Sequence, residues 1–195
     1  MLIAMEGSSP TIRGENNYKY YVWNAYQQTK ESSKLYIPGP ATISWGLSSI
    51  NIRTMADNAT AFIRAGSGPI YLVGWSRGGA ACVQVAIDLK NSGFGRNIDA
   101  LFLFDPVDQD GSTADFLNVV PSNVTNCYHA EALSKEGIWA SVFPTCAKKF
   151  ETGVNYVPGK FNTTHGGIAG TEGGSKGDAG SGAWMWGHMT TKGVI

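Results

Sequence analysis

The stretch Ile70–Lys90, IYLVGWSRGGAACVQVAIDLK, decides the fold that we expect for this chain. Its first four residues are apolar and predict a buried strand, whereas the residues from Ala80 onward predict a helix. Between them lies GWSRG, residues 74–78, which is a GxSxG sequence. Glycines two positions before and after a serine permit the sharp strand-to-helix turn that exposes a nucleophilic hydroxyl. The stretch therefore predicts a nucleophile elbow with Ser76 at its tip. The alternative is a glycine-rich turn without a chemical role.

Strands and helices alternate along the rest of the sequence. Further strands are predicted at Leu2–Met5, Lys34–Ile37, Ala100–Phe104 and Val154–Val157. Apolar residues at helical spacing predict one helix over Tyr18–Tyr26 and another over Ile52–Ile63, which Gly66 would end. Such alternation implies a mostly parallel, doubly wound sheet with helices on both faces. The expected fold class is α/β, a single α/β-hydrolase-like domain over residues 1–195.

The last part of the chain has a different composition. Over residues 166–195 glycine, serine, threonine and alanine dominate, and Trp184 and Trp186 are the bulky anchors. We expect a glycine-rich C-terminal loop region here, with one short helix near Ala183–Met189. The change in composition indicates a long loop at the active site rather than a second domain.

Length and charge exclude several classes of protein. The 195 residues include 15 Lys and Arg and 15 Asp and Glu, so the formal net charge is zero and nucleic acid is a poor partner. No apolar run approaches the roughly 20 residues of a membrane-spanning helix, so contact with a membrane would be peripheral at most. The start MLIAMEGSS lacks the basic and apolar regions of a signal peptide. We expect synthesis in the cytoplasm and, if the protein is exported, a route without a signal peptide.

Cysteine and histidine spacing argues against a disulfide scaffold or a metal site. Cys82, Cys127 and Cys146 are an odd number without CxxC spacing, although Cys127 could still pair with Cys146. No two of the three histidines have a metal-ligand spacing such as that of HExxH. The sequence therefore implies neither a metal nor another cofactor.

A carboxylate is expected to orient the base of an elbow serine. In parallel-sheet hydrolases the chain order is serine, acid, histidine, and the acid follows a strand. Asp105 fits the acid, because it comes directly after the apolar run ALFLF. Asp108 is the reserve candidate, since it lies further out, where a solvated turn residue is expected.

Three histidines compete for the role of the base. His165 lies in the polar sequence TTHGG after the last predicted strand, where a side chain can reach back over the sheet edge. His129 follows an apolar stretch, Val124–Tyr128, and is better interpreted as a hydrogen-bonded structural histidine. His188 has bulky apolar residues nearby and is equally well explained by packing. We therefore predict His165 as the base.

The tetrahedral intermediate of acyl transfer needs two hydrogen-bond donors. One is the backbone N–H of the residue after the nucleophile, Arg77. The other should come from the loop after the first strand, where the backbone of Gly7 and Ser8, together with the Ser8 hydroxyl, can approach a substrate. The alternative for Gly7 and Ser8 is a plain turn before Pro10.

Blocks of this sequence resemble, in order, those of the DUF2235 domain. They are LIAMEGSS, YIPGP, IYLVGWSRGG, LFLFDPV, HAEALSKEGIWASVF and YVPGKFNTTHGGIAG, and they extend over about residues 2–170. That domain belongs to the α/β-hydrolase-like phospholipase effectors of type VI secretion, often called Tle1-like. The resemblance implies a triad of the serine in GxSRG, the aspartate after the next strand and the histidine after PG. By position these are Ser76, Asp105 and His165, the residues that the spacing also predicts.

These features together predict an enzyme, a serine hydrolase that cleaves small-molecule or lipid esters through an acyl-enzyme intermediate. One alternative is a cutinase-like polyester esterase, because a short sheet without a cap would leave the serine open to bulky substrates. Another is a non-catalytic binding or effector module that keeps the fold. The resemblance favours phospholipids, whereas a neutral chain without a long amphipathic or basic segment favours soluble esters with short to medium acyl chains. We expect phospholipid cleavage to be the weaker activity.

Overall fold

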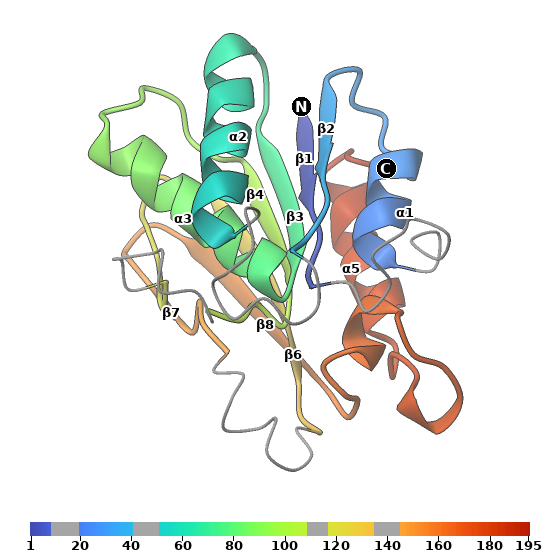
Figure 1. Ribbon diagram of the computed structural model, residues 1–195. Coiled ribbons are helices and arrows are strands. Elements are labelled where there is room, and N and C mark those ends of the chain that lie inside the picture. The colour runs from blue at the N-terminus through green and yellow to red at the C-terminus, as the bar shows by residue number, and fades with distance from the viewer. Residues whose placement is uncertain (9–19, 41–50, 109–116, 135–144) are drawn as a thin grey trace.

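Six parallel strands form the central sheet of the computed structural model, which describes residues 1–8, 20–40, 51–108, 117–134 and 145–195. The strands are β1 (Leu2–Met5), β2 (Lys34–Ile37), β3 (Tyr71–Trp75), β4 (Ala100–Phe104), β6 (Asn126–Ala132) and β8 (Asn155–Phe161). Their order across the sheet is β2-β1-β3-β4-β6-β8, and every neighbouring pair is parallel. The carboxyl ends of all these strands therefore lie at one edge of the sheet (Figure 1).

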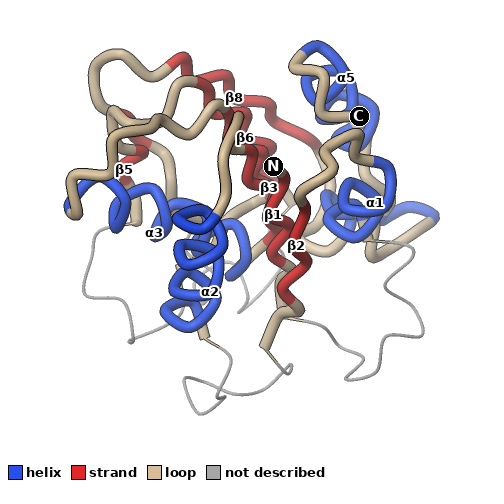
Figure 2. Tube along the Cα trace, turned by 90° about the horizontal axis from the view of Figure 1, so that it is seen from above, coloured by secondary structure: helices blue, strands red, loops and turns tan. Residues whose placement is uncertain are grey.

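Helices cover both faces of this sheet. They are α1 (Tyr21–Gln28), α2 (Ile52–Ala65), α3 (Arg77–Asn91) and α5 (Ser181–Thr191), with two 3-10 helices, η2 (Gly167–Ala169) and η3 (Gly174–Lys176). The helices α2 and α3 pack on one face, and α1 and α5 pack on the other (Figure 1, Figure 2). Two short strands, β5 (Val119–Val120) and β7 (Lys149–Phe150), form a separate parallel pair. The predicted α/β fold class, with a parallel, doubly wound sheet, is confirmed.

The alternation of side chains along β1 divides the core into two layers. Ile3 and Met5 pack in the layer that holds α2 and α3, whereas Leu2 and Ala4 pack in the layer that holds α1 and α5. All four residues are fully buried, which is why the strand is a continuous apolar run in the sequence. The next residue, Glu6, continues the alternation and falls on the α1 side.

The start and end of α2 follow from local signals. The Asn51 side chain accepts the Thr54 N–H at 2.8 Å, and the Thr54 hydroxyl accepts the Asn51 N–H at 2.9 Å, which is a capping box. Gly66 caps the other end, as predicted, but its backbone is extended (φ −107°, ψ 179°) rather than left-handed. The helix therefore ends where the sequence indicates, through a different backbone geometry.

The sequence prediction missed β6. Its seven residues, NCYHAEA, mix polar and apolar side chains, so they lack the apolar run that marks the other central strands. Nevertheless β6 lies between β4 and β8 and is buried at all positions but one. Burial is tolerated because Asn126 donates to the Asp99 carbonyl at 2.8 Å and His129 bonds to the Tyr156 hydroxyl at 2.8 Å.

The C-terminal part of the chain holds more regular structure than predicted. The last strand was expected to end before Pro158, but β8 continues through it to Phe161. Proline is tolerated there because β8 stands at the end of the strand order, where a missing N–H breaks no ladder to a further strand. The region predicted as a loop contains η2, η3 and the 11 residues of α5, a helix longer than the predicted Ala183–Met189.

Within the described ranges, every helix is too short or too polar to cross a membrane. Cys82, Cys127 and Cys146 are buried free thiols, so the pairing of Cys127 with Cys146 that the sequence left open does not occur. Burial raises the pKa of all three thiols, which keeps them in the unreactive protonated form.

Candidate active site

Ser76 lies at the junction of β3 and α3, at the carboxyl edge of the sheet. Its backbone has φ 54° and ψ −125°, which a residue with a side chain adopts only under strain. The Ser76 N–H donates to the Phe104 carbonyl at 3.1 Å, and the Ser76 carbonyl accepts the Val107 N–H at 3.0 Å. Main-chain groups of β4 and of the loop that follows it thus hold the serine in the turn that the GxSxG spacing predicts.

Close contacts explain both glycines of the motif. A Cβ atom at Gly74 would lie 2.5 Å from the carbonyl oxygen of Gly78, and a Cβ atom at Gly78 would lie 2.0 Å from that of Met5. Both distances are well below van der Waals contact, and both involve backbone atoms that cannot move aside. The glycines are therefore required by the packing of α3 against β1 and β3.

The helix α3 also contributes to the site. It begins at Arg77, so the backbone N–H of this predicted oxyanion donor belongs to the first turn of a 15-residue helix. The N-terminus of a helix carries a partial positive charge of about half an elementary charge. This charge lies next to Ser76, where negative charge would develop on the substrate during acyl transfer.

Asp105 directly follows β4 and is fully buried. Its Oδ2 atom lies 2.7 Å from Nδ1 of His165, and its Oδ1 atom accepts the Thr145 hydroxyl at 3.0 Å. Its backbone has a φ of 39°, and its N–H donates to the Ala130 carbonyl at 2.7 Å. The carboxylate is therefore fixed toward the histidine from several directions. It is Asp105, and not the reserve candidate Asp108, that faces Nδ1 of His165.

His165 lies in the turn between β8 and η2. Its carbonyl accepts the indole N–H of Trp75 at 3.0 Å, and the centres of the two rings are 5.4 Å apart. Because Trp75 immediately precedes Ser76, these contacts hold the histidine turn against the elbow. A carboxylate only accepts hydrogen bonds, so Nδ1 carries the hydrogen and Nε2 is the basic nitrogen of the neutral ring. The side chain is 23% exposed, which makes it accessible to a substrate.

The other two histidines have structural surroundings, as the sequence indicates. His129 is 1% exposed, its Nδ1 lies 2.8 Å from the Tyr156 hydroxyl, and desolvation lowers its pKa. His188 stacks on Tyr128 with ring centres 4.2 Å apart, and it packs edge-on against Trp184. Hydrogen bonding at Nδ1 fixes the ring of His129, whose buried Nε2 has no partner among the described residues, and aromatic packing accounts for His188.

The loop after β1 lies against the elbow, as the predicted oxyanion donors require. A Cβ atom added to Gly7 would be 2.9 Å from the Ser76 Cβ atom and 2.6 Å from the Trp75 ring. The Gly7 N–H itself donates to Oε1 of Glu6 at 3.2 Å. Of the two residues predicted for this role, Ser8 is therefore better placed to direct its backbone N–H at a substrate.

Sequence reasoning missed Glu6. The residue is 1% exposed, and desolvation raises the pKa of its carboxyl group to about 8, although hydrogen bonds from the Gly7 N–H and the Tyr36 hydroxyl lower it in part. The signal was available, because an acidic residue directly follows the apolar run of β1 and precedes a glycine. Trp75 and Thr145 were also missed, since nothing in their local sequence marks a contact with a distant histidine or aspartate.

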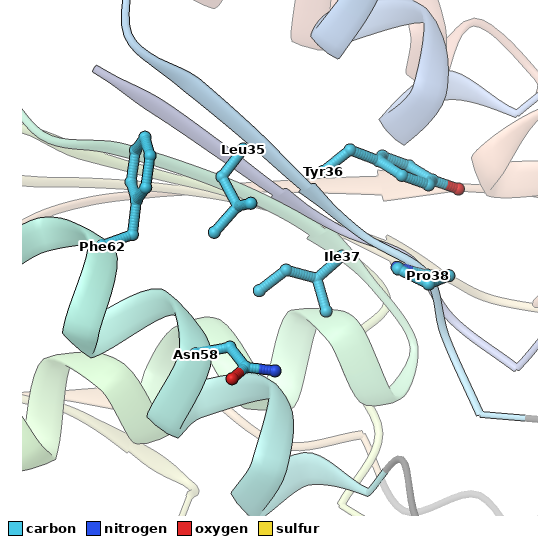
Figure 3. A pocket seen from close by; sticks show the side chains of 6 residues that line it. All are labelled: Leu35, Tyr36, Ile37, Pro38, Asn58 and Phe62. Atoms are coloured by element: carbon cyan, nitrogen blue, oxygen red, sulfur yellow. The ribbon is translucent and has the colours of Figure 1, made fainter.

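An apolar groove lies between β2 and α2. Its volume is about 440 Å³, and its lining consists of Leu35, Tyr36, Ile37, Pro38, Asn58 and Phe62 (Figure 3). Pro38 is followed by Gly39, which packs so closely on the loop after β1 that an added Cβ atom would lie 1.7 Å from the Gly7 carbonyl oxygen. The Pro38 end of the groove is thus adjacent to the predicted oxyanion donors.

The described residues of the site supply a strained serine, a histidine paired with a carboxylate, and a helix N-terminus. This set can activate a hydroxyl group, transfer a proton and stabilise negative charge on oxygen. In the ranges that the structure describes, no three His, Cys, Asp or Glu side chains are grouped so that they could hold a metal ion.

No family model and no curated protein matches the chain, so the resemblance to the phospholipase effectors stays a prediction. Among solved structures the chain is similar to the crystal structure of SOBER1 from Arabidopsis thaliana, with 12% sequence identity and a TM-score of 0.47, over 96% of this chain and 98% of that chain. A likeness this weak carries no argument about function, so a functional conclusion has to come from the site itself.

Proposed function

We propose that this protein is a serine hydrolase of carboxylic esters, with Ser76 as the nucleophile, His165 as the base and Asp105 as the acid that orients the base. The observation that carries the proposal is the 2.7 Å distance between Asp105 Oδ2 and His165 Nδ1, at the sheet edge where Ser76 occupies a strained turn. A buried carboxylate on Nδ1 selects the tautomer that can accept a proton at Nε2 and stabilises the imidazolium that forms.

In the first half of the reaction the enzyme is acylated. Nε2 of His165 takes the proton from the Ser76 hydroxyl as Oγ attacks the ester carbonyl, and the new C–O bond gives a tetrahedral oxyanion. The backbone N–H groups of Arg77 and Ser8 donate hydrogen bonds to this oxyanion, assisted by the partial charge of α3. The carbon–oxygen bond to the leaving group then breaks, and the imidazolium gives its proton to the departing alkoxide.

In the second half water replaces the alcohol. His165 accepts a proton from the water molecule as the water oxygen attacks the acyl carbon. A second tetrahedral oxyanion forms, and it accepts hydrogen bonds from the same backbone N–H groups. When this intermediate collapses, the bond to Ser76 Oγ breaks and the proton on Nε2 returns to the serine. The carboxylic acid leaves, and the enzyme is restored without a change in its own composition.

For the substrate we propose a soluble or dispersed ester with a short to medium acyl chain. The formal net charge of zero supports this choice, because attraction to an anionic bilayer needs clustered basic residues. The resemblance to type VI effectors points instead to phospholipids. Specific activities on a soluble butyrate ester and on phosphatidylglycerol vesicles separate the two. Higher activity on vesicles, with activation at the lipid interface, would contradict the choice of soluble esters.

Covalent labelling tests the reaction class. A fluorophosphonate should form an adduct that mass spectrometry maps to Ser76, and Ser76→Ala should abolish both this adduct and the hydrolysis of p-nitrophenyl butyrate. Circular dichroism and thermal unfolding establish that the variant is folded. Folded wild-type protein that is not labelled, or is labelled elsewhere, would contradict the proposal and favour a non-catalytic module with the same fold.

A further inference from the structure

Glu6 is a buried acid that the triad does not use, although the next residue, Gly7, lies against Ser76. It follows β1, and its backbone N–H donates to the Ile37 carbonyl at 3.0 Å, which extends the pairing of β1 with β2 by one bond. On the other side, α3 packs tightly on the same backbone, because a Cβ atom at Gly78 would lie 2.6 Å from the Glu6 carbonyl oxygen. The main chain at Glu6 is thus held between β2 on one side and the first turn of α3 on the other.

The side chain of Glu6 has two hydrogen-bond partners. Oε1 accepts the Gly7 N–H at 3.2 Å, and Oε2 accepts the Tyr36 hydroxyl at 3.3 Å. The Tyr36 side chain points in the opposite direction from those of Leu35 and Ile37 (Figure 3). The Tyr36 ring is held there by Trp23, with ring centres 4.8 Å apart.

These contacts fix the main chain on both sides of Gly7. The Glu6 carboxyl group accepts the Gly7 N–H, which belongs to the Glu6–Gly7 peptide, and Gly39 is packed against the carbonyl oxygen of the Gly7–Ser8 peptide. In a trans peptide the N–H of the next residue points opposite to that carbonyl oxygen. The Ser8 N–H therefore points away from Gly39, and Gly7 itself lies against Ser76.

We propose that Glu6 is a positioning residue of the oxyanion site: its carboxyl group, held by Tyr36, fixes the main chain at Gly7, and this fixed main chain places the Ser8 N–H where it can donate to the oxyanion. The inference rests on the proposed serine-hydrolase function. It adds a requirement that the triad alone does not impose, namely that this carboxyl group be neutral. A carboxylate at this position would repel the negative charge that develops on the substrate.

The surroundings of Glu6 favour the neutral form. Desolvation raises the pKa of its carboxyl group to about 8, and the hydrogen bonds from Gly7 and Tyr36 lower the pKa by less than desolvation raises it. Of the described titratable groups on neighbouring elements, Tyr36 on β2 touches the carboxyl group, and Tyr20 interacts with Tyr36. Arg77 belongs to α3, and the Asp105–His165 pair lies beyond Trp75 at the same sheet edge.

The pH dependence of Ser76 labelling by a fluorophosphonate tests this inference in the intact chain. The second-order rate constant of the wild-type protein should fall as the pH rises past about 8, because Glu6 ionises. In Glu6→Gln the amide oxygen can accept the Gly7 N–H and the amide nitrogen can donate to the Tyr36 hydroxyl oxygen, but the group cannot ionise. The rate constant at pH 7 should therefore stay within about threefold, and the alkaline fall should vanish.

Two further variants separate positioning from mere stability. Tyr36→Phe removes a hydrogen bond that lowers the pKa of Glu6, so the alkaline fall should move to higher pH. Glu6→Leu removes the acceptor of the Gly7 N–H and should slow labelling of the folded protein by about 10- to 100-fold at pH 7. A thermal unfolding curve for each variant ensures that only folded protein is compared.

The outcomes distinguish this inference from the function on which it rests. If folded wild-type protein is not labelled at Ser76, the proposed function fails and the inference fails with it. If Ser76 is labelled but the wild-type rate shows no alkaline fall, or the fall persists unchanged in Glu6→Gln, the inference alone is overturned. Equal labelling rates for Glu6→Leu and wild type would overturn it as well.

Discussion

His129 and His165 show how two regions of one molecule give the same side chain different chemistry. His129 is on β6, 1% exposed, with Nδ1 shared between the Tyr156 hydroxyl and the Ala147 carbonyl at 2.8 Å and 3.2 Å. His165 is in a turn after β8, 23% exposed at its side chain, with Nδ1 on the Asp105 carboxylate at 2.7 Å. The hydrogen-bond partners of the first are neutral, whereas the partner of the second is a carboxylate.

The partner and the exposure of a histidine, not its distance from a motif in the sequence, determine what it can do. Burial lowers the pKa of His129 because the charged ring would lose its hydration. A ring that must gain and release a proton in each cycle needs a counter-charge and access to the substrate. Among the three histidines, His165 has the carboxylate partner that this role requires.

The largest effect is expected from the loss of the His165 imidazole. His165→Ala should lower the rate of p-nitrophenyl butyrate hydrolysis by about 10²- to 10⁴-fold, because the general base is lost while the oxyanion donors remain. The midpoint of thermal unfolding should change little, since the ring is partly exposed. Steady-state kinetics on folded protein measure the effect. A variant that retains wild-type activity would remove His165 from the mechanism.

The opposite pattern is expected at His129. His129→Ala should lower the free energy of unfolding by about 2–4 kcal/mol, because it leaves a cavity between β6 and β8 and removes a partner of the Tyr156 hydroxyl. The activity per folded molecule should remain within a few-fold of the wild type. Urea unfolding and kinetics on the same sample test both statements. A loss of activity in a stable His129 variant would reverse the roles of the two histidines.

The pH dependence of stability should also report on His129. Its pKa is lowered in the folded state, so below about pH 6.5 the unfolded chain binds more protons than the folded chain. This contribution to stability is therefore complete at neutral pH and is lost as the pH falls from about 6.5 toward the folded-state pKa. Unfolding in urea at pH 7 and pH 5 measures the loss.

His129→Asn is the matched control for this titration. The amide can replace the Nδ1 hydrogen bond but does not titrate, so the variant should lose less stability than the wild type between pH 7 and pH 5. The pKa of His188 is lowered as well, but His188 is present in both proteins, so its contribution cancels in the difference. Identical losses in the two proteins would show that His129 does not contribute.

A smaller effect is expected from Thr145, which sharpens the description of the His165 region. Thr145→Val removes the hydroxyl that donates to Asp105 Oδ1 at 3.0 Å, so the carboxylate is held less firmly toward the histidine. We expect kcat to fall by about 3- to 10-fold with little change in KM. Thr145→Ser keeps the hydroxyl and should retain most of the activity. Equal losses in both variants would indicate that packing, and not this hydrogen bond, matters.

Much of the fold and of the candidate site could be predicted because the relevant forces act between residues close in the sequence. The strand, turn and helix around Ser76 follow from an apolar run, two glycines and a helix former. The position of Asp105 follows from the buried strand directly before it. The strand β6 could not be found in this way, because its polar residues bond to Asp99, just before β4, and to Tyr156 on β8, which are distant in the sequence.

The sequence by itself determined the order of the strands and helices around Ser76, though not the presence of β6, and the chemical types of the candidate active-site residues, since periodicity and glycine sterics are local properties. Only the tertiary structure decided that the Asp105 carboxylate meets Nδ1 of His165, that Trp75 holds the histidine turn, and that Glu6 lies buried. Each of these facts depends on which segments pack side by side. Burial and the pKa of a carboxyl group depend on that packing in turn, because they are set by everything that surrounds the group and not by its neighbours in the chain.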